Sequence, residues 1–189
     1  MYKISIVATL IIIGGCSSEI RTYSDYDPDY DLKTYTTFTW KQIENIELGR
    51  NPLYYNELND KRIKSAVQKE LISKGYTLSD NKSDFVVHYH IIVDDQSIVT
   101  TDPHEEFYSP YWTHLRTSIS QYREGTLIID VMDPQDSNLI WRGRAVSAIK
   151  EVHTPGQIDQ LIKTTVAKIF RKFPKKDNTS RREEKVVLN

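Results

Sequence analysis

Residues 84–93 read DFVVHYHIIV, and their alternation is the clearest structural signal in the sequence. In an extended chain, successive side chains point to opposite faces. One face then carries Phe85, Val87, Tyr89, Ile91 and Val93, and the other carries Val86, His88, His90 and Ile92. Because the first face is entirely apolar or aromatic while the second holds two imidazoles, the pattern predicts a strand with one face buried in the core.

Three further segments have the composition of strands. They are residues 35–40 (YTTFTW), residues 117–132, in which Leu127, Ile129 and Val131 share a face, and residues 139–149 (LIWRGRAVSAI). Residues 133–138 (DPQDSN) are a turn by composition, so the last three strands should form an antiparallel meander. Residues 94–116 are interpreted as a long connection. A helical crossover should place the first strand parallel to a neighbour.

Two segments have apolar residues at helical spacing. In residues 56–74 these are Leu58, Ile63, Ala66, Val67, Leu71 and Ile72, and Gly75 follows where a left-handed residue would end the helix. The second helix begins at Thr154-Pro155-Gly156-Gln157. There Thr154 and Gln157 form a capping box, and Pro155 suits the first helical position. Pro174 ends it.

The order along the chain is therefore β-α-β-β-β-α. Two amphipathic helices need an apolar surface to cover, and a sheet with one apolar face supplies it. The sequence predicts an α+β fold, a two-layer sandwich. Its mostly antiparallel four-stranded sheet should carry both helices on one face.

Composition and charge exclude several classes of protein. The chain has 189 residues, with 25 Lys and Arg against 26 Asp and Glu, and its formal net charge is −1. This balance argues against a dedicated nucleic-acid binder, so no nucleic-acid partner is expected. A mean hydropathy of −0.52 excludes a protein with many membrane spans. With one Cys, the chain has no internal disulfide framework.

The N-terminus has the layout of a secretory signal. Lys3 precedes an apolar run at residues 4–13 (ISIVATLIII), and Gly14-Gly15 lead to Cys16, the only Cys. The run is shorter than the roughly 20 residues that a membrane-spanning helix needs. Ile13-Gly14-Gly15-Cys16 resembles the bacterial lipobox, which implies cleavage before Cys16 and a lipid anchor on that residue, with acyl chains such as palmitate. Ser17 in place of Asp favours, by the same resemblance, the outer membrane.

These signals divide the chain into four parts. Residues 1–15 are the expected lipoprotein signal peptide, and 16–22 the lipidated N-terminus and spacer. Residues 23–174 form the α+β domain, and 175–189 a charged tail that is expected to be disordered.

Several short motifs occur in a characteristic order behind the lipobox. They are Thr37-Phe38-Thr39-Trp40, Asn51-Pro52-Leu53, residues 62–67 (RIKSAV), residues 74–76 (KGY), residues 84–90 (DFVVHYH), residues 124–130 (EGTLIID), residues 139–143 (LIWRG) and residues 169–174 (IFRKFP). In this order the chain resembles the domain of unknown function 4136 lipoprotein family over about residues 16–174. The resemblance implies a compact α+β domain in the cell envelope and supplies no catalytic residues.

Two clusters of titratable residues are candidates for chemistry. His88 and His90 share one face of a strand and could supply two imidazoles to Zn²⁺, with further ligands from His104, His114, His153, Asp94 or Asp95. The competing interpretation is that the two rings occupy the more polar face of a half-buried strand. Glu124, Asp130 and Asp133 are acidic, but Glu124 and Asp130 would lie about 20 Å apart on one strand, and Asp133 suits a turn.

Two surfaces are candidates for binding. The connection at residues 104–116 contains four aromatic residues, Phe107, Tyr108, Tyr111 and Trp112. These side chains could contact a partner, or they could fold back and cover one edge of the core. Arg142 and Arg144, next to Trp141, could bind an anionic group. Alternatively, they could lie on the solvent-exposed outer face of the sheet. The basic tail is expected to be solvated.

The sequence therefore predicts a lipid-anchored lipoprotein of the outer membrane, facing the periplasm of a Gram-negative bacterium. It should be a non-catalytic binding or interaction module. No nucleophile elbow or phosphate-binding loop is present, so we expect no enzyme and no cofactor. The expected partners are the membrane, through Cys16, and an envelope protein or glycan. The alternative is a metal-assisted hydrolase of an envelope polymer that uses His88 and His90.

Overall fold

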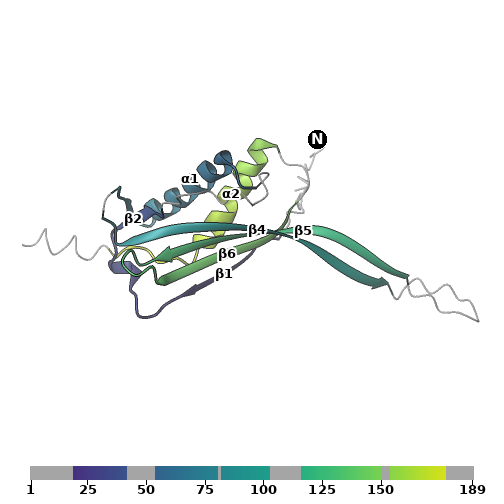
Figure 1. Ribbon diagram of the computed structural model, residues 1–189, viewed down its shortest axis with the longest axis horizontal. Coiled ribbons are helices and arrows are strands. Elements are labelled where there is room, and N and C mark those ends of the chain that lie inside the picture. The colour runs from purple at the N-terminus through teal and green to yellow at the C-terminus, as the bar shows by residue number, and fades with distance from the viewer. Residues whose placement is uncertain (1–18, 42–53, 81, 103–115, 150–153, 178–189) are drawn as a thin grey trace, which may run out of the picture.

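The chain is described here by a computed structural model, which covers residues 19–41, 54–80, 82–102, 116–149 and 154–177. Its elements in chain order are β1 (Arg21–Tyr26), the 3-10 helix η1 (Leu32–Thr34), β2 (Thr37–Trp40), α1 (Glu57–Ser73), β3 (Thr77–Leu78), β4 (Phe85–Asp102), β5 (Arg116–Met132), β6 (Leu139–Ile149) and α2 (Pro155–Phe170). The strands form one open sheet, and both helices lie on the same face of it (Figure 1).

The sheet confirms the α+β class but corrects its details. It has six strands in the order β1-β6-β5-β4-β2-β3, so the expected four-stranded sheet is wrong. β1 is an added antiparallel edge strand on β6, and β3 is a two-residue edge strand parallel to β2. β2 also runs parallel to β4, as the helical crossover requires. The meander β4-β5-β6 is antiparallel, as predicted.

The second correction concerns residues 94–116. Instead of beginning a connection, residues 94–102 continue β4, and β5 begins at Arg116, with Asp102 opposite Arg116. The aromatic residues expected to bind a partner, Phe107, Tyr108, Tyr111 and Trp112, lie outside the described residues. So do Cys16 and residues 178–189 of the tail, whereas Lys176 and Asp177 donate backbone hydrogen bonds to the carbonyls of Lys74 and Lys33.

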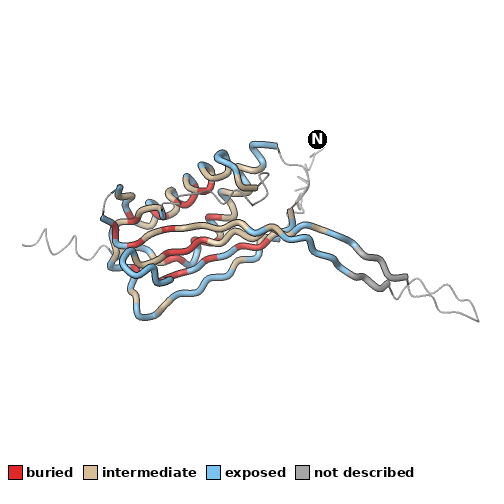
Figure 2. Tube along the Cα trace, viewed as in Figure 1, coloured by how far each residue is buried: buried red, intermediate tan, exposed pale blue. Residues whose placement is uncertain are grey.

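Aromatic side chains fill one end of the core. Phe85 and Trp141 come from the sheet, Phe170 from α2, and Tyr76 and Phe173 from the segments that follow the two helices. The rings of Trp141 and Phe173 meet edge to face at 4.8 Å, and those of Tyr76 and Phe85 at 5.4 Å. Such contacts add to the burial of large apolar surfaces. These aromatic side chains therefore fill this end of the sandwich. Figure 2 colours the backbone by burial and shows buried residues on the helices and on the strands beneath them.

Both helices begin where their sequences predict, and α1 also ends there, whereas the expected end of α2 at Pro174 is wrong. Asn56 caps α1, and Gly75 has a φ of +97°, which a residue without a Cβ adopts at little cost. The capping box of Thr154 and Gln157 starts α2, although this helix ends at Phe170, before Pro174. In β6, an added Cβ at Gly143 would lie 2.3 Å from the Trp141 ring and 2.5 Å from Ile169, so glycine allows α2 to approach the sheet closely there.

Candidate functional site

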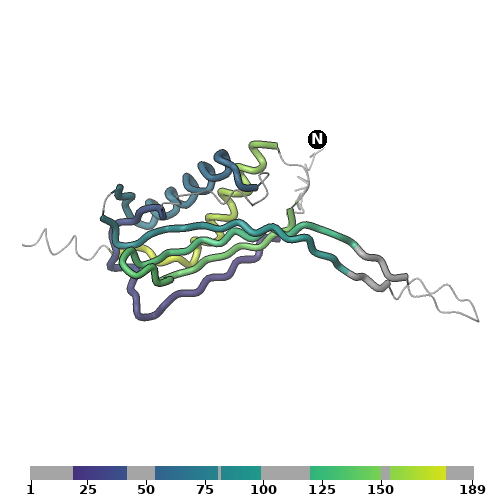
Figure 3. The backbone as a smooth tube through the Cα atoms, viewed as in Figure 1, coloured from purple at the N-terminus to yellow at the C-terminus, as the bar shows by residue number. Residues whose placement is uncertain are grey.

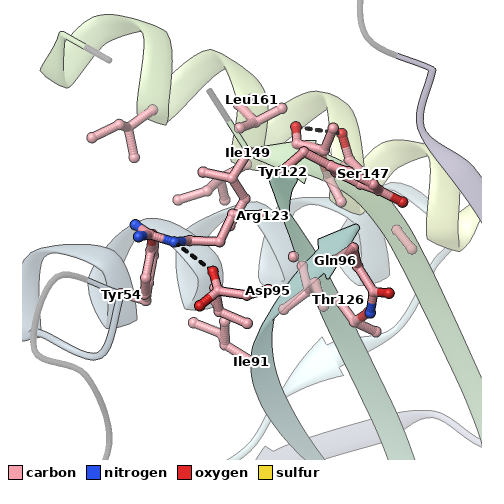
Figure 4. A pocket seen from close by; sticks show the side chains of 18 of the residues that line it. Tyr54, Ile91, Asp95, Gln96, Tyr122, Arg123, Thr126, Ser147, Ile149 and Leu161 are labelled. Atoms are coloured by element: carbon pink, nitrogen blue, oxygen red, sulfur yellow. Dashed lines mark hydrogen bonds and ion pairs between the residues drawn. The ribbon is translucent and has the colours of Figure 1, made fainter. Parts of the chain in front are cut away.

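A cleft of about 1140 Å³ lies between the two helices and the sheet, at the end opposite the aromatic cluster (Figure 4). Its roof comes from α1 through Asn59 and Ile63, and from α2 through Ile158, Leu161, Ile162 and Thr165. Its floor comes from the middle of β4 and β5 and from the C-terminal end of β6. A volume of this size is slightly above the range of about 300–1,000 Å³ that is typical of small-molecule sites.

The cleft forms because the helices and the sheet fill the core at one end only. The fully buried residues of α2 are Val166, Ile169 and Phe170, all in its C-terminal turns. Under its N-terminal turns, the floor carries small residues at Gly125, Ala145 and Ser147. The small side chains of Ala145 and Ser147 leave a gap that the apolar residues of the helices do not fill, whereas the side chain of Ile149 lies over Gly125.

The walls of the cleft are mainly apolar. Its aliphatic lining residues are Ile63, Ile91, Val93, Leu127, Ala145, Ala148, Ile149, Ile158, Leu161 and Ile162. The two charged lining residues, Asp95 and Arg123, form an ion pair at 3.0 Å on the exposed side of the cleft. Tyr54 stands beside Arg123, as Figure 4 shows. The described interior therefore offers apolar contact and no unpaired charge.

The open face of the sheet carries a second polar group of residues. His88, Asp130 and Arg142 are opposite one another on β4, β5 and β6. The Arg142 Nε and Nη2 atoms donate to the two carboxylate oxygens of Asp130 at 2.6 and 2.7 Å, and the Asp130 side chain is 5% exposed. The Nε2 atom of His90 lies 3.6 Å from Asp130. This group is a sheet-face ion pair flanked by imidazoles.

The two imidazoles predicted as metal ligands lie together. The rings of His88 and His90 meet at 4.3 Å, almost perpendicular. Burial, and after it the proximity of His90, lowers the pKa of His88 from about 6.5 to about 4, so the ring is neutral at pH 7. Arg142 already engages both oxygens of the nearest carboxylate. Within the described residues, no group of three or more His, Cys, Asp or Glu side chains is arranged to hold a metal ion.

The other residues singled out in the sequence are dispersed. Glu124 pairs with Arg21 at 3.0 Å, and Asp133 accepts from the backbone N–H of Gln135 in the turn. Trp141 points into the core, whereas Arg144 lies on the outer face over the Tyr23 ring, at 4.6 Å.

Sequence reasoning missed the cleft. The available signal was the run of small residues at the core-facing positions Gly125, Ala145 and Ser147, where the other strands carry large apolar side chains. That signal becomes readable only once the strand register is known.

Comparison with solved structures finds a similar fold in a protein of different sequence. A PDZ domain protein from Parabacteroides distasonis is 14% identical with a TM-score of 0.53, over 85% of this chain. This chain spans only 37% of the length of that protein. The PelC dodecamer from Paraburkholderia phytofirmans is 8% identical with a TM-score of 0.42, covering 80% of this chain and 95% of PelC.

No curated protein matches the sequence. Neither of the two described helices is long and apolar enough to cross a membrane. A family model does match, and it confirms the family to which the sequence motifs pointed. The match extends over residues 22–175, from β1 to the segment after α2, and the chain therefore belongs to the family described as Domain of unknown function (DUF4136).

Proposed function

We propose that this protein is a lipid-anchored binding module of the cell envelope, and that its cleft takes the acyl chain of a lipid. The observation that carries the proposal is the cleft itself, whose described lining exposes more apolar than polar surface and whose two charged residues among those described, Asp95 and Arg123, form an ion pair with each other. An apolar ligand gains binding free energy there because its surface is removed from water, by about 0.8 kcal/mol for each buried CH₂ group. Among the described residues that line the cleft, a charged ligand would find no unpaired charge.

The anchor supports the choice of ligand. Cys16 precedes Arg21, the first residue of β1, by five residues, which span at most about 18 Å when extended. Arg21 lies opposite Val146, next to Ala145 in the floor of the cleft. A lipid on Cys16 would therefore hold the cleft end of the domain close to a membrane, where acyl chains are abundant. Figure 3 follows β1 along this edge of the sheet.

The proposed location is the periplasmic face of the outer membrane, because the sequence ending in Cys16 resembles a lipobox and Ser17 follows it. The proposed role is binding without catalysis. Replacing Cys16 with Ser should leave an unlipidated precursor that is lost from the membrane fraction and is not labelled by radioactive palmitate. A Cys16→Ser protein that stays in the membrane fraction would contradict the anchor.

The cleft is tested separately, in intact cells fed a fatty acid that carries a photoreactive diazirine. After irradiation, the full chain should carry adducts on peptides from β6 and α2, the two elements that form much of the cleft. Leu161→Glu places a charge in the apolar wall and should reduce these adducts about tenfold. Ile72→Glu is the matched control, because Ile72 is an exposed apolar residue of α1 away from the cleft. Equal labelling of the two variants would contradict the proposal.

A further inference from the structure

Three elements of the fold begin at the end of the sandwich that holds the cleft. α1 and α2 begin there, because Asn59 and Ile63 in the first turns of α1 and Ile158 in the first turn of α2 line the cleft. β1 begins there as well, because Arg21 lies opposite Val146, whose two neighbours in β6 also line the cleft. The parts of β4 and β5 that extend beyond β6 project away from the helices (Figure 1). They therefore leave the starts of the two helices uncovered.

A second hollow, of about 410 Å³, lies between the starts of the two helices. Its lining includes Leu58 and Arg62 of α1 and Pro155 and Ile158 of α2, and Ile158 also lines the cleft. The Leu58 side chain is 64% exposed, the largest exposed fraction among the large aliphatic residues that the structure describes, and Pro155 is exposed too. Exposed apolar surface gathered at one place indicates contact with another molecule or with a membrane.

The position of the expected anchor selects the membrane as the partner, and this step rests on the lipid anchor of the proposed function. Ile20 packs against the hydrophobic core, and Cys16 precedes it by four residues, which span at most about 14 Å. A lipid on Cys16 must therefore enter a bilayer close to the start of β1. Because β1 contacts α2, the helix that carries Pro155, that bilayer is the apolar phase nearest to the hollow.

The charges around Leu58 suit an anionic lipid surface. Lys61 and Arg62 follow Leu58 by three and four residues, so both are its neighbours on the surface of α1. Asp60 forms an ion pair within α1, so Glu57 is the one remaining acid in these two turns against two bases. Long basic side chains can lay their stems on apolar surface and keep their charged ends among lipid headgroups. Apolar side chains beside basic ones are typical of helices that contact a membrane surface.

We propose that the starts of α1 and α2 dock on the bilayer that holds the anchor, with Leu58, Pro155 and Ile158 at the boundary between the headgroups and the acyl chains. This docking deepens the proposed role, because it presents the cleft to the membrane from which the cleft would take an acyl chain. The acyl chain then passes from the bilayer to the cleft without exposing its apolar surface to water.

Fluorophores on engineered cysteines test the docking. Cys16 is the only Cys, and acylation would block its thiol, so an added Cys would be labelled at one site. Gly156→Cys is the docking probe, because an added Cβ at this position, next to Pro155, meets nothing within 4 Å. Ile72→Cys is the matched control, because Ile72 is also an exposed residue of α1 and lies about 21 Å along the helix from Leu58. The full lipidated chain would be reconstituted in vesicles of phosphatidylethanolamine and phosphatidylglycerol.

The fluorophore on Gly156→Cys should be quenched by spin-labelled lipids and shielded from iodide in the water, and the fluorophore on Ile72→Cys should show the reverse. Adding Leu58→Asp to Gly156→Cys should return its fluorophore to water, whereas adding Ile72→Asp should not. Equal quenching by iodide at the two positions would overturn the docking. A fluorophore on Gly156→Cys that neither quencher reaches would also overturn it, because a second copy of the chain would then cover this surface.

Flotation of the same vesicles separates this proposal from the anchor and from the cleft. Chains carrying Leu58→Asp should still float with the vesicles, because the lipid on Cys16 holds them. Floating chains that fail the quenching test would refute the docking and leave the anchor standing. Chains that do not float would overturn the anchor and the docking together. Docking in a chain whose cleft gains no fatty-acid adducts would support the docking and refute only the proposed ligand of the cleft.

Discussion

Replacing Arg142 with Met should destabilise the fold through Asp130. The Asp130 side chain is 5% exposed, and the Arg142 guanidinium donates a hydrogen bond to each of its carboxylate oxygens, at 2.6 and 2.7 Å. In Arg142→Met, the carboxylate keeps only His90 nearby, at 3.6 Å. Breaking a fully buried ion pair from one side costs about 3–5 kcal/mol. Since the Arg142 side chain is 47% exposed, water reaches the pair, and about 2–3 kcal/mol is expected.

That loss corresponds to a fall in Tm of about 5–10 °C for a domain of this size. Urea unfolding and calorimetry should be measured for Arg142→Met, Asp130→Asn and the double variant. Because Asn carries no charge to be left unpaired, the double variant should be more stable than the sum of the single losses implies, by about 1 kcal/mol or more. Additive losses, or an Arg142→Met cost below about 0.5 kcal/mol, would show that the pair does not stabilise the sheet.

Three further predictions concern the closed end of the core and the imidazoles. Gly143→Ala should lower the free energy of unfolding, measured in urea, by about 1–3 kcal/mol, because the added Cβ would overlap Trp141 and Ile169. An unchanged urea midpoint would show that α2 shifts freely. The pKa of His88 is lower in the fold than in the unfolded chain, so the free energy of unfolding should fall by about 1–2 kcal/mol as the pH drops from about 6.5 to about 4, after allowing for screening by water. The His88→Gln variant should show a weaker dependence of this free energy on pH. An equally steep dependence in the variant would assign the effect to other groups. Because Arg142 occupies the nearest carboxylate, the purified chain should contain no stoichiometric zinc and should have the same Tm with and without a chelator. One equivalent of zinc that is lost in a His88→Gln, His90→Gln double variant would instead support the metal-assisted hydrolase.

Local patterns predicted the elements that have one buried face. Alternation identified the first part of β4, where Phe85 and Val87 are fully buried, and capping residues identified both helix starts. These signals work because they depend on neighbours within a few residues along the chain. The same reasoning placed His88 and His90 on the more polar face.

Elements exposed on both faces gave no such pattern. β1 reads RTYSDY and is largely exposed, so nothing in its sequence alternates between core and solvent. Residues 94–102 of β4 read DDQSIVTTD, in which neither alternate set of positions is consistently apolar, and this part of the strand was mistaken for a connection. The cleft depends on how α2 is held against Gly143 and Trp141 at the other end of the sandwich, a long-range contact that no local pattern contains.

The most direct test of the proposed function is native mass spectrometry of the full chain released from membranes. We predict one non-covalently bound acyl lipid per chain, in addition to the covalent lipids on Cys16, lost in Leu161→Glu and retained in Ile72→Glu. A wild-type chain that carries no such lipid, or one that Leu161→Glu retains to the same extent, would contradict binding in the cleft.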